Sequence, residues 1–309
     1  MAGSMGEVGE FGLVARVTAS LATGPGVLVG PGDDAAVVAA PDGRVVATTD
    51  VLVEGRHFRL DWSSPYDVGR KAAAQNLADV AAMGARATAL VCGLAAPASF
   101  PLADAEALAR GLSDEAALVG AYVVGGDVVA CDTVVVAVTA FGDLGGRAPV
   151  TRGGARPGDV LVVAGTLGGS AAGLAALRAG RPDLAAVAAH RVPSPPYDAG
   201  PELAAYGATA MIDVSDGLTG DLAHVAAASG VGFVVDVAAL PRHPAVAEAA
   251  AALGLDPVAW VLAGGEDHAL VATLPAPVPG YAVVGRAVAE PGITWEGVDV
   301  VPRSYDHFG

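Results

Sequence analysis

Short apolar segments bounded by turn residues predict two strands within the first fifty positions. These segments are 35–40 and 45–47, and such runs are typical of strands. The Pro-Asp-Gly sequence at 41–43 predicts the turn between them. If the strands pair as a hairpin, the carboxylates of Asp34 and Asp50 come to its open end. Clustered carboxylates repel one another and favour bound cations, although Asp in loops also closes turns and caps helices.

Helical and strand patterns alternate through the rest of the chain. A helix is predicted over 67–84, beginning near Asp67 and ending at Gly84. Asp79 falls among apolar residues of this helix, so we expect it to be partly buried and either paired or bound to a cation. The other predicted elements are a helix at 8–22, a strand at 88–94, a helix at 103–120, strands near 122–129 and 133–139, a strand at 160–164, two alanine-rich helices, a strand before Asp213, a helix from about 219, a strand at 232–237, a helix at 244–253 and two final strands.

Three features indicate how the chain is divided and where ligands approach it. The Gly-, Pro- and Arg-rich stretch at 147–159 predicts a boundary between domains 1–148 and 149–309, each long enough for its own core. Gly125, Gly126 and Asp127 stand between two apolar runs, which suits either a bulge or a close approach of the backbone to a ligand. The third feature is that each half brings an acidic turn to the end of an apolar strand.

The charge and the cysteine content of the chain exclude some classes of function. The formal net charge is −16, and Lys71 is the single lysine, so no basic patch is present to bind nucleic acid or an anionic membrane. The longest uncharged run, 160–177, contains four glycines and predicts a strand, a turn and a helix rather than a membrane span. The N-terminus has no basic region typical of a signal peptide. We expect a cytoplasmic protein in which Cys92 and Cys131 are buried free thiols.

Several well-known catalytic motifs are missing from the chain. It has no GxxxxGK[ST] phosphate loop, no GxSxG nucleophile elbow, no HExxH zinc motif and no GxGxxG dinucleotide fingerprint. A set of oxygen donors near strand ends remains. Its members are Asp34, Asp50, Asp79, Asp127, Asp213 and Asp216, with Thr48, Thr49 and Ser215. Oxygen-only sets suit Mg²⁺ or Ca²⁺, and Mg²⁺ is commonly completed by phosphate oxygens, which points to metal-assisted phosphoryl transfer.

Nine sequence blocks, in order along the chain, resemble the thiamine-monophosphate kinases of the AIR-synthetase-like (PurM-like) ATP-binding superfamily. The blocks are GPGDDAAVV, TTDVLVEGRHF, KAAAQNLADVAAMGA, GGD, TRGGARPGD, GTLGGSAAGL, MIDVSDGLTGDL, GGED and SYDHFG. The resemblance implies an α/β protein of the α+β type with a two-domain PurM-like fold. It implies that the N-terminal sheet pairs across a homodimer into a barrel, and that a C-terminal α/β domain packs alongside.

The resemblance also implies roles for individual residues. The residues that match magnesium ligands are Asp34, Thr48, Thr49, Asp50, Asp79, Asp127, Asp213 and Asp216, of which Asp50, Asp127 and Asp213 are the catalytic candidates. The ATP contacts implied are Gly126, Asp127, Arg152 and Ser215, and the thiamine-phosphate contacts are His57, Glu266 and Tyr305. Relatives usually carry Tyr where this chain has His268, so the role of that position stays open.

The implied reaction converts thiamine monophosphate and ATP into thiamine pyrophosphate with the help of several Mg²⁺ ions. We expect direct in-line transfer without a strong base, because the attacking phosphate is already ionised near neutral pH. Other members of the superfamily are expected to show a lysine near the N-terminus or a C-terminal cysteine, and this chain has neither. A nucleotide- or ion-binding module without turnover is the alternative. The aromatic tail at 304–309 predicts a wall of the thiamine site, through stacking and cation–π attraction.

Overall fold

The chain forms two compact units. The structure is a computed structural model that describes residues 5, 7, 16–19, 21–30 and 36–302. The first unit comprises Met1–Val80 and Ala85–Arg147, and the second comprises Ala81–Gly84 and Ala148–Gly309. Each unit has its own sheet, and the mixture of helices and strands confirms the predicted fold class. Among the described residues, none of the helices combines the length and apolarity that a membrane-spanning helix needs.

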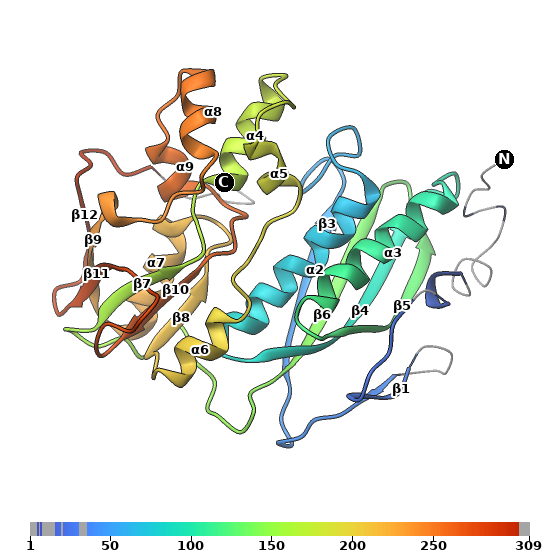
Figure 1. Ribbon diagram of the computed structural model, residues 1–309, viewed down its shortest axis with the longest axis horizontal. Helices are drawn as coiled ribbons and strands as arrows, with labels where there is room; N and C mark the ends of the chain where they lie inside the picture. The colour runs from blue at the N-terminus through green and yellow to red at the C-terminus, as the bar shows by residue number, and fades with distance from the viewer. Residues whose placement is uncertain (1–4, 6, 8–15, 20, 31–35, 303–309) are drawn as a thin grey trace. The chain divides into compact units, whose positions relative to one another are not determined.

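The first unit is built on a four-stranded sheet in the order β3-β6-β4-β5. Its strands are β3 (Val46–Val53), β4 (Arg86–Ala96), β5 (Tyr122–Ala130) and β6 (Val135–Asp143). Only the β4–β5 pair is parallel. Helices α2 (Pro65–Ala82) and α3 (Leu102–Ala117) cover one face of this sheet (Figure 1). The two short strands β1 (Val27–Val29) and β2 (Val37–Val38) form a separate antiparallel pair.

Strand β3 shows how the two faces of this sheet differ. Thr48, Asp50 and Leu52 alternate onto the side of α2, where Leu52 is completely buried. Thr49 and Val51 point to the other face, where both are exposed. Because side chains alternate along a strand, this face stays open over its length within the unit.

The structure corrects the predicted hairpin. Strand β2 pairs with β1 rather than with β3, and all eight residues of β3 pair with β6, from Val46 opposite Gly142 to Val53 opposite Val135. Strand β6 is long and alternates regularly, so it can form more backbone hydrogen bonds with β3 than the two-residue strand β2 can. The prediction was wrong because an apolar run indicates a strand but does not identify its partner. Cys131 is also exposed rather than buried, since it lies in the turn after β5.

The paired glycines form part of a bulge within β5, as one of the two interpretations predicted. Val123 lies opposite Leu90 and Gly125 lies opposite Val91, so that Val124 is the extra residue. A Cβ atom on Gly126 would collide with the carbonyl oxygen of Cys92. Close packing between β4 and β5 therefore explains the second glycine without any ligand.

The start of α2 is a capping box. Asp67 Oδ2 accepts hydrogen bonds from the backbone N–H of Ser64 at 3.1 Å and from its hydroxyl at 2.8 Å. The N–H of Asp67 donates to Ser64 Oγ at 3.2 Å. Ser64 is thus the N-cap and Asp67 the third helical residue, which moves the predicted start by three positions. Gly84, at φ +75°, follows the end of the helix as predicted.

The second unit is built on a six-stranded sheet in the order β12-β9-β11-β7-β10-β8, in which only β12 and β9 are parallel. Its strands are β7 (Val160–Ala164), β8 (Ala210–Asp213), β9 (Gly232–Asp236), β10 (Leu270–Leu274), β11 (Val283–Val288) and β12 (Gly292–Glu296). Its helices are α4 (Gly169–Arg178), α5 (Ala186–Arg191), α6 (Ala199–Ala205), α7 (Leu218–Ser229), α8 (Val246–Leu253), α9 (Val258–Ala263) and the 3₁₀ turn η1 (Val237–Ala239). The sequence did not predict α6, α9 and β12, which are short and lack a clear periodicity.

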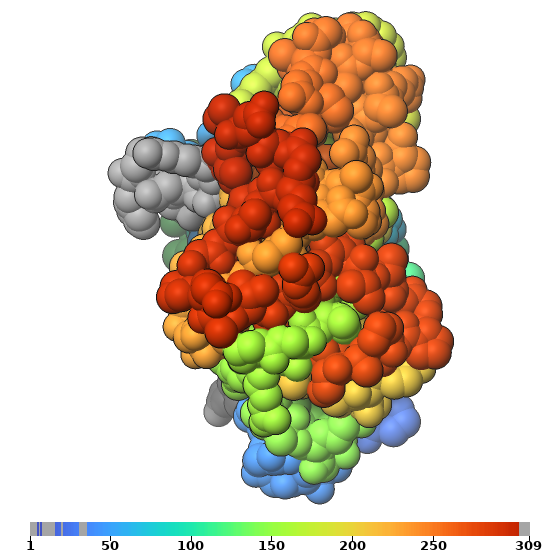
Figure 2. Space-filling model, turned by 90° about the vertical axis from the view of Figure 1, so that its left-hand side faces the viewer, coloured from blue at the N-terminus to red at the C-terminus, as the bar shows by residue number. Residues whose placement is uncertain are grey.

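Both faces of the second sheet are buried around its central strand β7. Along β7, Leu161 and Val163 belong to one apolar core, whereas Val162 and Ala164 belong to the other. The continuous apolar run of this strand is the pattern expected when both faces are covered. The segments that carry β11 and β12 reach the surface, where they are drawn in red (Figure 2).

Candidate functional site

Polar side chains from β3 and α2 meet on the covered face of the first sheet. Thr48 Oγ1 donates a hydrogen bond to Asp79 Oδ2 at 2.6 Å. Two residues along β3, the N–H of Asp50 donates to Asn76 Oδ1 at 3.1 Å. Asn76 and Asp79 are three residues apart and share one face of α2. The structure thereby brings together three predicted site residues, Thr48, Asp50 and Asp79, and adds Asn76, which the sequence reading did not single out.

Asn76 anchors β3 to α2. Its side chain is completely buried, and its Nδ2 donates to the carbonyl oxygen of Ala72 at 2.9 Å. A buried amide whose donor and acceptor groups are both bonded fixes the neighbouring backbone. An Asn in the apolar body of a predicted helix is the signal that could have revealed it.

Thr49 and Asp127 lie elsewhere. Thr49 points to the open face, where its hydroxyl donates to the carbonyl oxygen of Val138 at 3.0 Å. Asp127 follows Gly126 on β5, at the opposite edge of the sheet from β3. Its row of neighbours runs through Gly93 and Ala137 to Val51, which is an open-face residue.

The separation between Asp127 and Asp50 follows from this register. Three strand spacings correspond to roughly 14 Å, and the two side chains leave opposite faces of the sheet. Asp127 is exposed, and its Oδ1 accepts a hydrogen bond from the N–H of Val128 at 2.8 Å. Within the first unit, therefore, Asp127 does not join Asp50.

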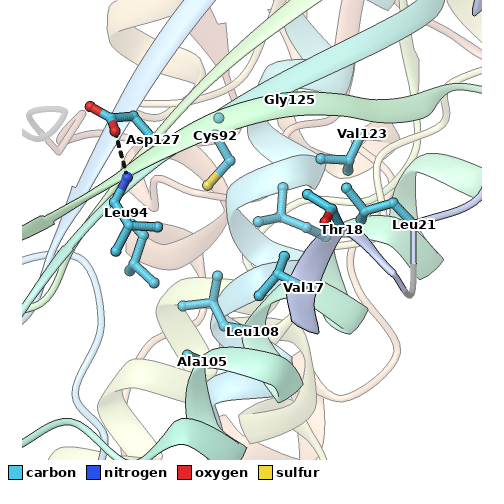
Figure 3. A pocket seen from close by; sticks show the side chains of 14 residues that line it. Val17, Thr18, Leu21, Cys92, Leu94, Ala105, Leu108, Val123, Gly125 and Asp127 are labelled. Carbon is cyan, nitrogen blue, oxygen red and sulfur yellow. Dashed lines mark hydrogen bonds between the residues drawn. The ribbon is translucent and has the colours of Figure 1, made fainter. Parts of the chain in front are cut away.

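An apolar cavity of about 80 Å³ lies beneath the Gly-Gly-Asp bulge. Its walls include Val17, Leu21 and Leu108, and the carboxylate of Asp127 points away from it (Figure 3). Cys92 also lines the cavity, and burial raises the pKa of this thiol to about 12. The thiol is consequently uncharged near neutral pH and takes the place of an apolar side chain.

His57 lies in the turn that follows β3. Its Nδ1 accepts a hydrogen bond from the N–H of Val53 at 3.0 Å, so the neutral ring carries its proton on Nε2. The buried ammonium of Lys71 donates to the carbonyl oxygen of His57 at 3.0 Å. The single lysine thus helps to hold this turn, which presents His57 as a donor.

In the second unit, β8 ends at an acidic turn. Asp213 is buried, and its Oδ2 lies 3.0 Å from His268 Nδ1. Asp221, in the first turn of α7, accepts the N–H groups of Asp216 and Gly217 through Oδ2, each at 3.1 Å. Burial, followed by the charges of Asp213 and Asp216, raises the pKa of Asp221 to about 7. Asp221 was not among the predicted site residues, although an Asp in the first turn of a helix is a recognisable signal.

The Gly-Gly-Glu-Asp turn packs against this acidic turn. The N–H of Glu266 donates to the carbonyl oxygen of Ser215 at 2.7 Å, and a Cβ on Gly265 would lie 2.6 Å from the same oxygen. Glu266 and His268 both adopt left-handed conformations, at φ 63° and 52°. Such conformations are uncommon for residues other than glycine and are concentrated at functional sites.

Arg152 lies in a loop that runs alongside the edge strand β8. The carbonyl oxygen of Thr151 accepts the N–H of Met211 at 3.0 Å. Ser229 Oγ donates to the carbonyl oxygen of Arg152 at 3.1 Å. The loop backbone is held in this way while the guanidinium of Arg152 is exposed.

The donor chemistry can be tested against a magnesium site. In the part of the chain that the structure describes, no group of three or more His, Cys, Asp or Glu side chains is arranged to hold a metal unaided. Asp213 and Asp216 nevertheless stand three residues apart at the end of β8, and Asp221 accepts the N–H of Asp216 in the same turn. Mg²⁺ commonly uses one or two carboxylates and completes its shell with water and phosphate. Asp213 and Asp216 therefore fit a Mg²⁺ ion that is bound together with a phosphate ligand. Asp34 and Tyr305 lie outside the described residues.

Comparisons with known proteins agree with this organisation. The models for AIR synthase related protein, N-terminal domain and C-terminal domain, match residues 32–144 and 156–296. Thiamine-monophosphate kinase of Mycobacterium tuberculosis is 54% identical over 300 residues, covering 94% of this chain and 90% of that protein. The crystal structure of thiamine-monophosphate kinase from Stenotrophomonas maltophilia is 31% identical, with a TM-score of 0.80 over 92% of this chain and 94% of that one. AaThiL complexed with AMPPCP and TMP is also 31% identical, with a TM-score of 0.80 over 98% of each chain.

Proposed function

This chain belongs to the thiamine-monophosphate kinase family, and from that premise we propose that it phosphorylates thiamine monophosphate with ATP to give thiamine pyrophosphate. The observation that carries this activity is the 54% identity to a thiamine-monophosphate kinase along 90% of its length. The similar AaThiL structure was solved with AMPPCP, an ATP analogue, and TMP together. The protein is an enzyme, a kinase whose acceptor is itself a phosphate group.

We assign Thr48, Asp50 and Asp79 to magnesium in the first unit, and Asp213 and Asp216 in the second. When bound, Mg²⁺ supplies positive charge that neutralises phosphate oxygens during transfer. Asn76 holds the backbone of Asp50, and Asp221 holds the backbone of Asp216. These two side chains fix the direction of the carboxylates that carry charge, which is the positioning that phosphoryl transfer needs.

Substrate binding falls to groups with complementary charge. Arg152 presents an exposed guanidinium, which suits bidentate contact with a phosphate of ATP. His57 presents Nε2–H as a donor, and Glu266 presents a carboxylate that suits the cationic thiamine moiety. Ser215 and Gly126 are assigned to ATP contact. The phosphate of thiamine monophosphate is already ionised near pH 7, so the reaction needs no strong general base.

A homodimer would cover the open face of the first sheet. This face carries exposed valines, among them Val51 and Val129, and a second copy would bury them. Two sheets facing one another across a twofold axis would also bring Thr49 and Asp127 of each copy to the interface. Thr49 and Asp127 are therefore proposed to lie between the subunits, whereas Asp50 stays on the opposite, helix-covered face.

Light scattering tests the proposed dimer. At micromolar concentration the protein should show twice the monomer mass, and a monomer mass would remove the proposed interface. Asp50→Asn and Asp127→Asn should each abolish turnover in a steady-state assay.

The activity itself is tested by incubating the purified protein with Mg-ATP and thiamine monophosphate. Chromatography should show thiamine pyrophosphate and ADP in equal amounts, and omission of Mg²⁺ should stop product formation. Binding of both substrates without product would favour the nucleotide-binding module instead. Conversion of another phosphate ester at a higher kcat/KM would reassign the substrate.

A further inference from the structure

A buried hydroxyl and imidazole meet the carboxylate of Glu266 in the second unit. Ser170 Oγ lies 3.1 Å from His190 Nδ1, and both atoms lie 3.5 Å from Glu266 Oε2. Ser170 is 2% exposed and His190 7%, whereas the side chain of Glu266 is 28% exposed. Two buried polar groups thus approach one oxygen of a carboxylate that is partly open to a ligand.

The fold brings these three residues from separate segments. Ser170 lies in the first turn of α4, His190 lies near the end of α5, and Glu266 lies in the turn before β10. A Cβ on Gly173 would lie 2.8 Å from His190 Cβ, so this glycine permits the close packing of α4 and α5 that brings the imidazole to Ser170. Glu266 holds its place in spite of a left-handed backbone conformation at φ 63°.

The proton positions follow from electrostatics. If His190 Nδ1 carried a lone pair, that lone pair would face the negative oxygen of Glu266, and the Ser170 hydroxyl would be drawn away from the carboxylate. If Nδ1 carries the proton, both His190 and Ser170 direct hydrogens toward Glu266 Oε2. The second arrangement avoids repulsion, and we assign the Nδ1–H form on this basis.

We propose that Ser170 and His190 are positioning residues that hold the carboxylate of Glu266 toward the cationic part of thiamine monophosphate. This inference rests on the proposed function and on the assignment of Glu266 to the substrate. Neither residue touches the reacting phosphates. Their loss should therefore weaken binding of thiamine monophosphate and leave Mg-ATP binding unchanged.

The direct test measures the binding of thiamine monophosphate by calorimetry, with Mg²⁺ and AMPPCP present, in Ser170→Ala and His190→Leu. Each variant should raise the Kd about tenfold, the effect expected when a hydrogen bond to a charged group is lost. His190→Asn keeps an N–H donor close to the position of Nδ1 and should recover most of the affinity. The KM for ATP and the melting temperature serve as controls for a general structural effect.

A double-mutant comparison separates positioning from packing. In a Glu266→Gln background, Ser170→Ala should change the Kd less than twofold, because the charge that it positions is already gone. A full tenfold effect in that background, or an equal rise in KM for both substrates, would overturn the inference while the kinase activity stands. If wild-type protein binds ATP but not thiamine monophosphate, the proposed function fails and this inference fails with it.

Discussion

The acidic groups of the two units are held in different ways. In the first unit they lie on a sheet with one open face, and Asp127 is exposed on that face. In the second unit Asp213 ends β8, a strand that is buried along its whole length, and is itself 4% exposed. Burial of a carboxylate costs free energy unless it is bonded, and Asp213 is paired with His268. The second unit is thus organised before any ligand binds, whereas the first is completed by ligands and, as we propose, by a second copy.

The second unit also uses carboxylates as backbone acceptors. Asp267 accepts the N–H groups of Gly168 and Ser170 at 2.5 and 2.9 Å and so caps α4 from 97 residues away in sequence. Asp221 does the same for the acidic turn. In the first unit the acceptor that holds the backbone of Asp50 is a neutral amide, Asn76. Some aspartates of the second unit therefore serve the structure rather than a ligand.

The largest expected effect separates activity from stability. Asp50→Asn and Asp213→Asn should each lower kcat more than a hundredfold, because each removes a charge that we propose to face the transferring phosphates. Only Asp213→Asn should destabilise the fold, by about 1–3 kcal/mol, since it disrupts a buried pair with His268. Urea unfolding without Mg²⁺ measures this difference. Equal destabilisation by both substitutions would contradict the difference between the acidic groups of the two units.

Two glycine substitutions test how tightly β5 packs against β4 at the edge of the first sheet. Gly126→Ala should lower the free energy of unfolding by about 2–3 kcal/mol, because the added methyl group meets the carbonyl oxygen of Cys92. Gly125→Ala is the matched control. Its Cβ would lie 3.9 Å from Val91 Cγ1, and we expect a loss below about 1 kcal/mol. If the two variants unfold at the same urea concentration, the bulge is loose rather than packed.

The partly buried acceptor Asp267 predicts a pH effect confined to the second unit. Burial raises its pKa from 3.8 to about 6, against the opposing effect of the N–H groups that it accepts. The folded state then binds a proton that the unfolded state has lost between these pH values, so stability falls as pH rises from 4 to 6. Because Asp267 is only partly buried, solvent screens part of this effect. We therefore expect a loss of about 1–2 kcal/mol, less than the full shift implies.

Asp267→Asn is the matched variant for this prediction. It should be less stable at every pH, because an amide cannot accept both N–H groups as a carboxylate does. Its unfolding free energy should nevertheless vary less between pH 4 and 6. A wild-type slope that persists unchanged in Asp267→Asn would assign the pH effect to another group.

The sequence predicted the strand-end carboxylates but not their geometry. Apolar runs followed by Asp50 and Asp213 predicted where the acidic groups stand, because period-2 patterns are local. The hairpin failed because pairing of β3 with β6 depends on contacts about ninety positions apart, as between Thr49 and Val138. His190 and Asp267 were likewise not recognised, since their roles arise from helix packing and long-range capping that no spacing rule describes.

The smallest expected effect concerns the cap of α2, which contrasts with the long-range cap of α4. Ser64→Ala should lower the free energy of unfolding by about 1 kcal/mol, because Asp67 loses the acceptor for its N–H, and Ser64→Gly should cost only a few tenths. Asp79 lies fifteen residues farther along the helix, or roughly 22 Å, so kcat should change less than twofold. Thermal unfolding and steady-state assays on the same samples measure both quantities. A stable Ser64→Ala protein with a tenfold lower kcat would show that the first site also depends on a distant cap, and the contrast between the two units would no longer hold.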